Sequence, residues 1–255
     1  MNNALEVRGV QKIYGSRGNI TTALDDVSFS VDQSDFVGIM GPSGSGKTTL
    51  LNCISTIDTV TAGHVIIGGD DVTRLKGDAL ARFRREKLGF IFQDFNLLDT
   101  LTAYENIALA LTINRVPPHE IDTRIHTTAD RLGISDVLNK YPYQMSGGER
   151  QRVASARAVI TDPTLVLADE PTGALDSRSS RVLLEGFEHM NVDMGATILM
   201  VTHDPLAASY CRRILFIKDG RVFNEIVRDE GDRASFFARV IEVVTLLGGD
   251  TADAL

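Results

Sequence analysis

Residue types that would mark several other classes of protein are scarce in this sequence. Cysteine occurs only twice in 255 residues, as Cys53 and Cys211, without any C-x-x-C spacing. Neither a disulfide framework nor a zinc site is therefore predicted, and we expect Cys53 to be a small core residue. No apolar run approaches the roughly 20 residues that a membrane-spanning helix needs. No secretory signal is predicted at the N-terminus either. We expect a cytosolic protein that meets a membrane only through a partner.

Positive charge is also in short supply. The 26 Lys and Arg residues are outnumbered by 34 Asp and Glu residues, which gives a formal net charge of −8. Proteins that bind nucleic acid without sequence preference normally need a basic surface, so no nucleic-acid partner is predicted. The densest basic run, residues 82–87, is interpreted as a solvated helix face. The length allows one large α/β domain or two smaller ones.

The most informative stretch is Gly41-Pro-Ser-Gly-Ser-Gly-Lys47-Thr48, which fits the pattern G-x-x-x-x-G-K-[ST]. Backbone N–H groups of such a loop bind the phosphates of a nucleotide, and the lysine neutralises their charge. A Gly/Ser-rich turn is the alternative, but an apolar strand (36–40) precedes the loop and a helix (47–57) follows it. We therefore predict a site for a nucleoside triphosphate, formed by Gly41, Pro42, Ser43, Gly44, Ser45, Gly46, Lys47, Thr48 and Thr49.

Apolar periodicity predicts an α/β fold. The first third is rich in half-buried strands, at residues 5–14, 23–31 and 63–67. Uninterrupted apolar strands then alternate with helices, which is typical of a parallel sheet buried on both faces. The strands are predicted at 36–40, 88–92, 165–168 and 197–201, the helices at 78–85, 103–111, 118–132, 148–160 and from 177, and a hairpin with an Asp-Gly turn at 214–226.

Two adjacent carboxylates, Asp169 and Glu170, follow the predicted strand 165–168. The carboxyl end of a buried parallel strand is where α/β folds bind their ligands. Asp169 would hold Mg²⁺ through water, with Thr48 as a direct ligand, and Glu170 would act as general base. An acidic turn after a strand, which Pro171 would suit, is the alternative. Beside a phosphate loop, the catalytic interpretation is favoured.

A second helix start with exposed amides is predicted at Ser146-Gly147-Gly148-Glu149, where Ser146 would be the cap. With Met145, this stretch resembles the L-S-G-G-Q signature of ATP-binding subunits of ABC transporters. Met145 and Glu149 depart from the signature, and Glu149 adds negative charge near bound phosphates. One chain with two such helix starts suggests that each grips a different side of a nucleotide. If one chain cannot fold its own two starts together, two chains would meet head to tail around ATP, each contributing a different start.

The resemblance covers nearly the whole chain and implies roles for residues that are unremarkable alone. Tyr14 would stack on adenine, although edge packing is its ordinary role. Gln93 would touch Mg²⁺ and the attacking water, although a Gln after a strand is usually a loop residue. Asp176, otherwise a plain helix cap, would lie between the paired subunits. His203, otherwise a turn residue, would contact the γ-phosphate.

The resemblance also implies an architecture. It is that of a P-loop NTPase of the ABC ATPase type, with a mixed sheet core, an N-terminal antiparallel β subdomain and an inserted helical subdomain. Residues 1–255 would form one domain, with a nucleotide-binding core at 1–93 and 161–228, a helical signature subdomain at 94–160 and a C-terminal helical extension at 229–255. The cofactors would be ATP and Mg²⁺. The subunit would lie on the inner face of the cell membrane through its permease.

Within the family, residues 94–102, 168–177 and 200–211 are similar to Bce-type antimicrobial-peptide resistance transporters, near the MacB and lipoprotein-release exporters. Segment 94–102 resembles the region that meets the permease. Residues 233–249 resemble the Bce-type extension, and docking on the chain itself is favoured over a partner-binding surface. One apolar helix face is predicted there, formed by Phe236, Phe237, Val240, Ile241, Val244 and Leu247.

Three alternatives remain open. One is a lipoprotein-release or cell-division ATPase, which shares most of these segments. A DNA-directed ABC ATPase would need heptads, cysteine pairs or a basic block between Lys47 and Ser146, where none is found. A scaffold that binds ATP without turnover is opposed by Glu170 and His203.

Overall fold

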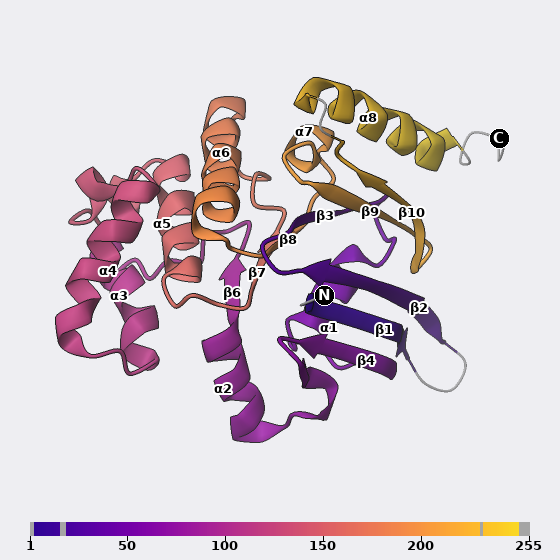
Figure 1. Ribbon diagram of the computed structural model, residues 1–255, viewed down its shortest axis with the longest axis horizontal. Coiled ribbons are helices and arrows are strands. Elements are labelled where there is room, and N and C mark those ends of the chain that lie inside the picture. The colour runs from indigo at the N-terminus through magenta and orange to yellow at the C-terminus, as the bar shows by residue number, and fades with distance from the viewer. Residues whose placement is uncertain (1–2, 16–18, 230–231, 250–255) are drawn as a thin grey trace.

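Two β-sheets enclose helix α1 (Lys47–Ile54), which contacts strands of both. The computed structural model describes residues 3–15, 19–229 and 232–249 (Figure 1). Strands of both sheets and α1 share one hydrophobic core, and the buried Cys53 is part of it, as predicted. The opposite face of the larger sheet packs on helices to form a second core.

The larger sheet has six strands in the order β10-β9-β3-β8-β7-β6. Its five strands from β9 to β6 are parallel, and β10 pairs with β9 in antiparallel orientation. Every residue of β3 and β8 is buried, which explains their uninterrupted apolar sequences. The bounds are β3 Phe36–Met40, β6 Leu88–Ile91, β7 Leu165–Asp169, β8 Ile198–Val201, β9 Arg213–Lys218 and β10 Arg221–Val227.

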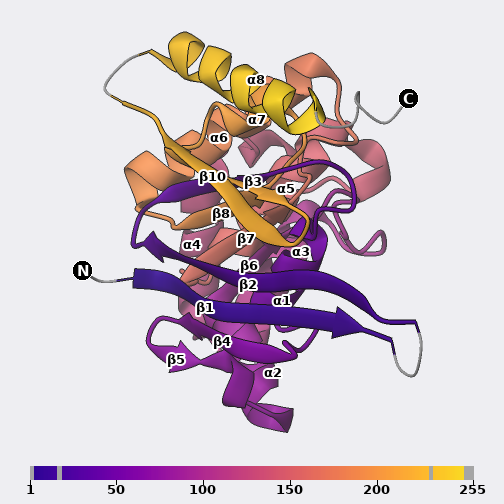
Figure 2. The same ribbon diagram turned by 90° about the vertical axis from the view of Figure 1, so that its right-hand side faces the viewer.

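The smaller sheet is antiparallel, in the order β2-β1-β4-β5. The long strands β1 and β2 run side by side across the molecule, with β4 beside β1 (Figure 2). This sheet was predicted apart from its short edge strand β5. The bounds are β1 Asn3–Tyr14, β2 Thr21–Asp32, β4 Ala62–Ile67 and β5 Asp70–Asp71.

The α-helices between β6 and β7 gather at one side of the molecule (Figure 1). They are α3 (Ala103–Ile113), α4 (Pro118–Arg131) and α5 (Gly147–Val159). Helix α6 (Ser177–Met194) packs against α5, and α2 (Gly77–Lys87) precedes β6. Short 3-10 turns lie at Val72–Arg74, Ser135–Val137 and Pro142–Gln144. The helices occur where they were predicted, within three residues at each end.

Two local predictions differ in outcome. The helix after the phosphate loop ends at Ile54 rather than at residue 57, because Thr56 adopts a φ of 62° and leaves helical geometry. The Asp-Gly hairpin is confirmed: Asp219 and Gly220 have φ values of 49° and 75°, as a tight turn between antiparallel strands requires.

The C-terminal helix α8 (Arg233–Gly249) docks on its own chain, as favoured, against the short helix α7 (Pro205–Ala208). Its Phe236, Val240 and Leu247 side chains are buried in the core on the helical side of the larger sheet. The predicted face was wrong at Ile241, which is 39% exposed; Val243 is buried instead. The buried stripe is therefore rotated relative to the one predicted.

Candidate functional site

The phosphate loop connects β3 to α1 and has the backbone geometry that only glycine permits at two positions. A Cβ on Gly41 would lie 2.1 Å from the Ile217 carbonyl oxygen, and one on Gly46 would lie 2.5 Å from that of Ala23. Gly44 has a φ of +78°, but no atom lies within 4 Å of its Cβ position. The loop is therefore packed on its protein side and open at Gly44.

The N-terminus of α1 is prepared for an anion. Its N-cap, Gly46, provides no side-chain cap, and the first turn contains no acidic residue. The first N–H groups of the helix and its positive dipole end therefore remain available to phosphate oxygens. Two loop hydroxyls differ: Ser43 is exposed, whereas Ser45 is buried and its Oγ has no hydrogen-bond partner among the described residues.

Lys47, the lysine of the loop, is folded back over it. Its Nζ donates hydrogen bonds to the Gly41 and Pro42 carbonyl oxygens, both at 2.8 Å. Burial lowers the pKa of Lys47, and the charges of Glu170 and Asp169 oppose this shift. The ammonium group is thus held by neutral carbonyls, which a phosphate could replace.

A cavity of about 510 Å³ lies over the loop. It brings together residues that the sequence analysis placed at one site and adds three residues of α8 that it did not. The predicted residues lining it are Gly41, Pro42, Ser43, Gly44, Lys47, Thr48, Glu170 and His203, and the others are Met40 of β3 and Val244, Leu247 and Gly248 of α8.

The acidic pair lies at the end of β7, beside the loop. Asp169 is half-buried, and its Oδ1 is buried with no hydrogen-bond partner among the described residues. Burial and the neighbouring Glu170 charge raise the pKa of Asp169, partly offset by Lys47. Glu170 adopts a φ of 44°, uncommon for a residue with a side chain, while its backbone N–H donates to Val201 O. This backbone turn directs the Glu170 side chain to the cavity.

Gln93 is exposed and is the second residue after the end of β6. A Cβ on Gly173 would lie 3.1 Å from Gln93 Cδ and 3.3 Å from the Glu170 carbonyl oxygen, so the two segments approach closely. The sequence analysis missed Gln151, a fully buried residue of α5. Gln151 Nε2 donates to Phe92 O at 3.2 Å and to Pro171 O at 3.1 Å, which joins the segments of Gln93 and Glu170.

Tyr14 lies at the end of β1 and does not line the cavity. Its hydroxyl donates to Asp58 Oδ2 at 2.7 Å, and the Lys12 ammonium lies 4.7 Å from its ring centroid. The ring is 40% exposed. The Tyr14 hydroxyl also contacts the side chain of Thr49, on α1.

The second predicted helix start is formed as expected but away from the cavity. Ser146 Oγ accepts from the Glu149 N–H at 3.3 Å, and the Glu149 carboxylate accepts from the Ser146 N–H at 2.6 Å. This capping box lowers the pKa of Glu149, and Lys140 lies 3.4 Å from its carboxylate. The additional negative charge is thereby compensated within the chain. Ser146 is exposed.

Asp176 caps α6 next to this helix start, accepting from the Arg178 and Ser179 N–H groups at 2.9 Å. A Cβ on Gly148 would lie 3.2 Å from Ser179, so the starts of α5 and α6 are in contact. Gly147 faces Leu175. None of the residues from Ser146 to Glu149 lines the cavity over the phosphate loop.

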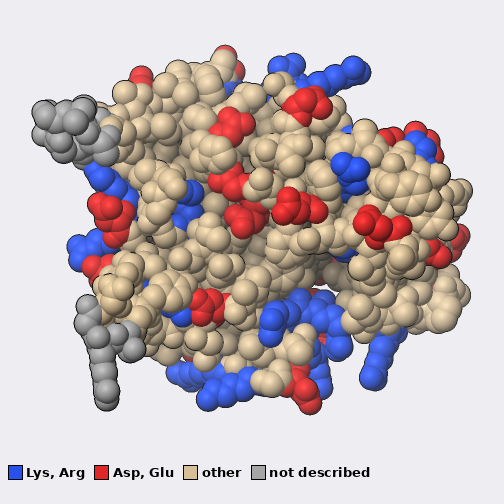
Figure 3. All heavy atoms as spheres, turned by 180° about the vertical axis from the view of Figure 1, so that it is seen from behind, with Lys and Arg blue, Asp and Glu red and all other residues tan. Residues whose placement is uncertain are grey.

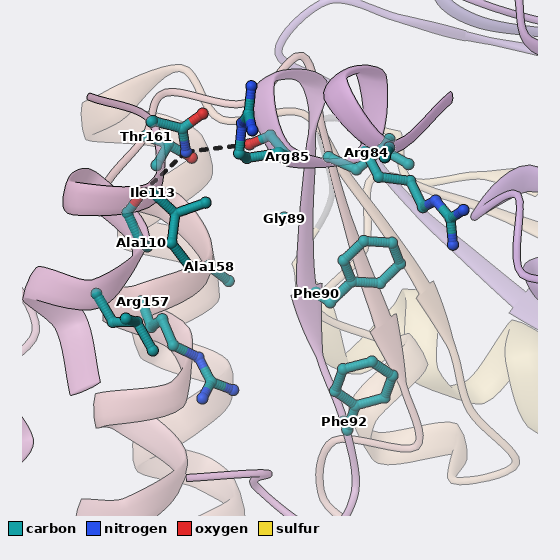
Figure 4. Close-up of a pocket in the computed structure, with 14 residues that line it drawn as sticks. Arg84, Arg85, Gly89, Phe90, Phe92, Ala110, Ile113, Arg157, Ala158 and Thr161 are labelled. Atoms are coloured by element: carbon teal, nitrogen blue, oxygen red, sulfur yellow. Dashed lines mark hydrogen bonds between the residues drawn. The ribbon is translucent and has the colours of Figure 1, made fainter. Parts of the chain in front are cut away.

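A second hollow, of about 540 Å³, lies between α2, β6, α3 and α5. Figure 4 shows Arg157 reaching from α5 toward β6, with Phe90 projecting from that strand and Phe92 from the residue just after it. Ile113, 49% exposed, lies on the opposite wall. We call this hollow the α2–α5 groove.

Comparison with known proteins identifies the family. The family model described as ABC transporter matches residues 24–173. The chain is 52% identical to the ABC transporter ATP-binding protein YxdL of Bacillus subtilis, over 99% of this chain and 98% of that protein. It is 47% identical to the bacitracin export ATP-binding protein BceA of Halalkalibacterium halodurans, over 96% and 97%.

A solved structure supports the same family. The dimeric post-hydrolysis state of the ATP-binding cassette MJ0796, bound to ADP and Pi, has a TM-score of 0.78 and 38% identity, covering 88% of this chain and 99% of that one. In the described part of this chain, no helix is long and apolar enough to cross a membrane. The fold, the phosphate loop and these likenesses lead to one conclusion: the chain belongs to the ABC transporter family, as an ATP-binding protein.

Proposed function

We propose that this chain hydrolyses ATP in a head-to-tail sandwich of two copies and thereby drives a permease of the Bce type. One observation carries the proposal: the uncapped start of α1 lines the cavity, whereas the start of α5, which carries the signature-like residues, is exposed away from it. The exposed start of α5 would complete the site of a second copy. A solved structure of MJ0796 is dimeric, and the bacitracin exporter name of BceA supports the transport role.

The site would hold the triphosphate by charge and by backbone amides. Lys47 would exchange its two carbonyl partners for the outer phosphates, and Gly44 leaves room for close approach. The orphaned, buried oxygen of Asp169 fits a role in holding Mg²⁺ through water, with Thr48 as a direct ligand and Gln93 nearby. Mg²⁺ would neutralise charge on the transferring phosphoryl group.

Glu170 would accept a proton from the attacking water, because its carboxylate reaches the cavity beside the loop. His203 Nδ1 lies 2.9 Å from Glu170 Oε2, so the ring would orient this carboxylate or turn to the γ-phosphate. Tyr14 would stack on adenine outside the cavity, held by its bond to Asp58. Ser146–Glu149 and Asp176 would act on the nucleotide of the other copy.

We assign the permease contact to the α2–α5 groove and to residues 94–102 beside it. Arg157 lines the groove and donates hydrogen bonds to the carbonyl oxygens of Phe95 and Asn96. The groove and residues 94–102 therefore form one surface. Apolar walls with arginines at Arg84 and Arg85 suit an amphipathic helix of the permease. The subunit would thus be held at the inner face of the membrane.

The transported or dislodged substrate would be an antimicrobial peptide, as the name of BceA indicates for that relative. No nucleic-acid partner is proposed, because the net charge is −8 and acidic side chains gather across the middle of the face in Figure 3. Within the chain, residues 94–160 would form the helical subdomain and 229–255 the extension, of which residues 230–231 and 250–255 lie outside the described part of the chain.

The test is ATP turnover by the chain co-purified with its permease. The parent should release phosphate, whereas Glu170→Gln should bind ATP normally, lose at least about a hundredfold in turnover and accumulate an ATP-bound dimer. If Glu170→Gln turned over ATP at the parent rate, Glu170 would not be the base. If the parent itself released no phosphate with the permease present, the chain would be a scaffold.

A further inference from the structure

Strands β6 and β7 are parallel neighbours, and their pairing ends just before the residues proposed to act on ATP. The last pair is Ile91 with Ala168. Gln93 follows the first of these residues by two positions, and Glu170 follows the second by two positions. The pairing of β6 with β7 therefore does not itself fix the distance between Gln93 and Glu170.

The side-chain amide of Gln151 joins the two segments beyond this point. Its Nε2 donates hydrogen bonds to Phe92 O at 3.2 Å and to Pro171 O at 3.1 Å. These oxygens belong to the residue directly before Gln93 and the residue directly after Glu170. Both are carbonyl oxygens, which only accept hydrogen bonds, so the NH₂ end of the amide is the end that faces them. One planar group thus sets the separation of the two segments.

Packing alone does not account for a glutamine at this position of α5. Apolar side chains already hold α5 in the core on the helical side of the larger sheet, among them Val153, Ala156 and Val159. Gln151 is fully buried, and its Oε1 has no hydrogen-bond partner among the described residues. A buried oxygen without a partner lowers stability, and an apolar side chain of the same length would fill the space without one. What the glutamine adds is the pair of donated hydrogen bonds.

We propose that Gln151 is a positioning residue for ATP hydrolysis, which holds the Gln93 and Glu170 segments at the separation that the reaction needs. The inference rests on the proposed roles of Gln93 toward Mg²⁺ and of Glu170 as general base. Gln151 does not line the cavity, so it acts only through these two segments. A misplacement of reacting groups by about 1 Å can lower a rate about a hundredfold. The phosphate loop, which supplies most contacts to ATP, is not touched by Gln151, so ATP affinity does not depend on it.

The experiment measures kcat and KM for ATP with the full chain co-purified with its permease. Equilibrium ATP binding and urea unfolding of the same variants give affinity and the folded fraction. Gln151→Met keeps the length of the side chain and removes both donated hydrogen bonds. Gln151→Asn keeps an amide but is one methylene shorter, so at least one of the two carbonyl oxygens loses its donor; it serves as the test if Gln151→Met does not fold.

Ser155→Ala is the matched control. Ser155 is buried and lies four residues further along α5, and its Oγ donates to Gln151 O at 2.9 Å, within the helix. Its loss therefore removes a buried hydrogen bond from the same helix without releasing either segment.

We expect the Gln151 variants to lower kcat per folded molecule about tenfold or more, with KM and ATP binding within about twofold of the parent. Ser155→Ala should stay within about twofold of the parent in kcat. Three results would overturn the inference: an unchanged kcat per folded molecule, a loss confined to ATP binding, or an equal loss of kcat in Ser155→Ala.

Glu170→Gln in the same assay tests the proposed function separately. If Glu170→Gln turns over ATP at the parent rate, the proposed base is wrong, and this inference fails with it. If Glu170→Gln is inactive while the Gln151 variants keep the parent kcat, the proposed function stands and only this inference fails.

Discussion

His203 contacts the catalytic candidate Glu170 twice. Its ring Nδ1 lies 2.9 Å from Glu170 Oε2, and its backbone N–H donates to the same oxygen at 3.3 Å. The His203 ring is largely exposed, with 73% of its side-chain area accessible, whereas that of Glu170 is 20% accessible. The carboxylate is thus fixed by a backbone group, while the imidazole is able to turn toward a bound phosphate.

His203→Ala should therefore separate binding from chemistry. The backbone contact remains, so Glu170 keeps its place and ATP affinity should change by less than about threefold. Loss of the ring removes a charge-stabilising group from the reacting phosphate, and turnover should fall by about 10². Phosphate release and equilibrium ATP binding, measured on the same preparation, check both. Unchanged turnover would show that the ring takes no part in hydrolysis.

Two glycines of the phosphate loop should respond differently to alanine. Gly41→Ala places a Cβ 2.1 Å from Ile217 O, so we expect unfolding free energy to fall by about 2 kcal/mol or more. Gly44→Ala meets no atom within 4 Å, and only its φ of +78° costs stability, by about 1 kcal/mol.

The same pair should differ in ATP binding per folded molecule. The methyl group of Gly44→Ala would project into the open side of the loop, where phosphate must approach, so its affinity loss should exceed its stability loss. Denaturant unfolding and ATP titration of both variants check this. Equal stability of the two variants would contradict the packing described for the loop.

The cluster around Tyr14 predicts a pH dependence. Hydrogen bonds from Lys12 and Tyr14 lower the pKa of Asp58 below its ordinary 3.8. A lowered native pKa means that the stabilisation is present above pH 3.8 and is lost as pH falls through the native value. Asp58→Asn should cost less than about 1 kcal/mol at pH 7, because the site is partly exposed.

The loss of stability caused by Asp58→Asn should vanish in strong acid, where the Asp58 carboxyl is protonated in the native state as well. Because Asp58 also orients the Tyr14 ring, Asp58→Asn should weaken ATP binding at neutral pH. Urea unfolding at a series of pH values gives the first result, with the exposed Asp70→Asn as the matched control. A stability difference that persisted at low pH would mean that charge is not its cause.

The α2–α5 groove predicts a defect limited to the permease. Ile113→Asp puts a charge on its wall and should abolish co-purification with the permease while leaving ATP binding by the isolated chain unchanged. Val192→Asp, on α6 and 72% exposed, is the matched control outside the groove. Retention of the permease by Ile113→Asp would place its contact elsewhere.

Most of the fold could be predicted from the sequence, because strands such as β3 are buried on both faces and therefore wholly apolar. The glycine-rich loop could also be predicted from the sequence, since close backbone contacts require glycine at positions 41 and 46. The end of α1 was not, because nothing in the local pattern marks the positive φ of Thr56.

The parts of the site that depend on tertiary contacts could not be predicted. Gln151 reads as one polar residue of a helix, and only the structure shows it joining Phe92 to Pro171. The approach of Val244 and Leu247 to the cavity depends on how α8 is rotated, and helical spacing alone gave that rotation incorrectly at Ile241. The roles of Tyr14 and Gln93 came from family resemblance and stay predictions.

The central claim is that the nucleotide held by one copy is completed by the α5 start of another. A structure of the Glu170→Gln chain with Mg²⁺ and ATP tests it most directly. We expect a dimer in which Ser146 of the partner subunit lies about 3 Å from a γ-phosphate oxygen that also contacts Lys47. A nucleotide-loaded complex in which Ser146 faces away from every phosphate would contradict it.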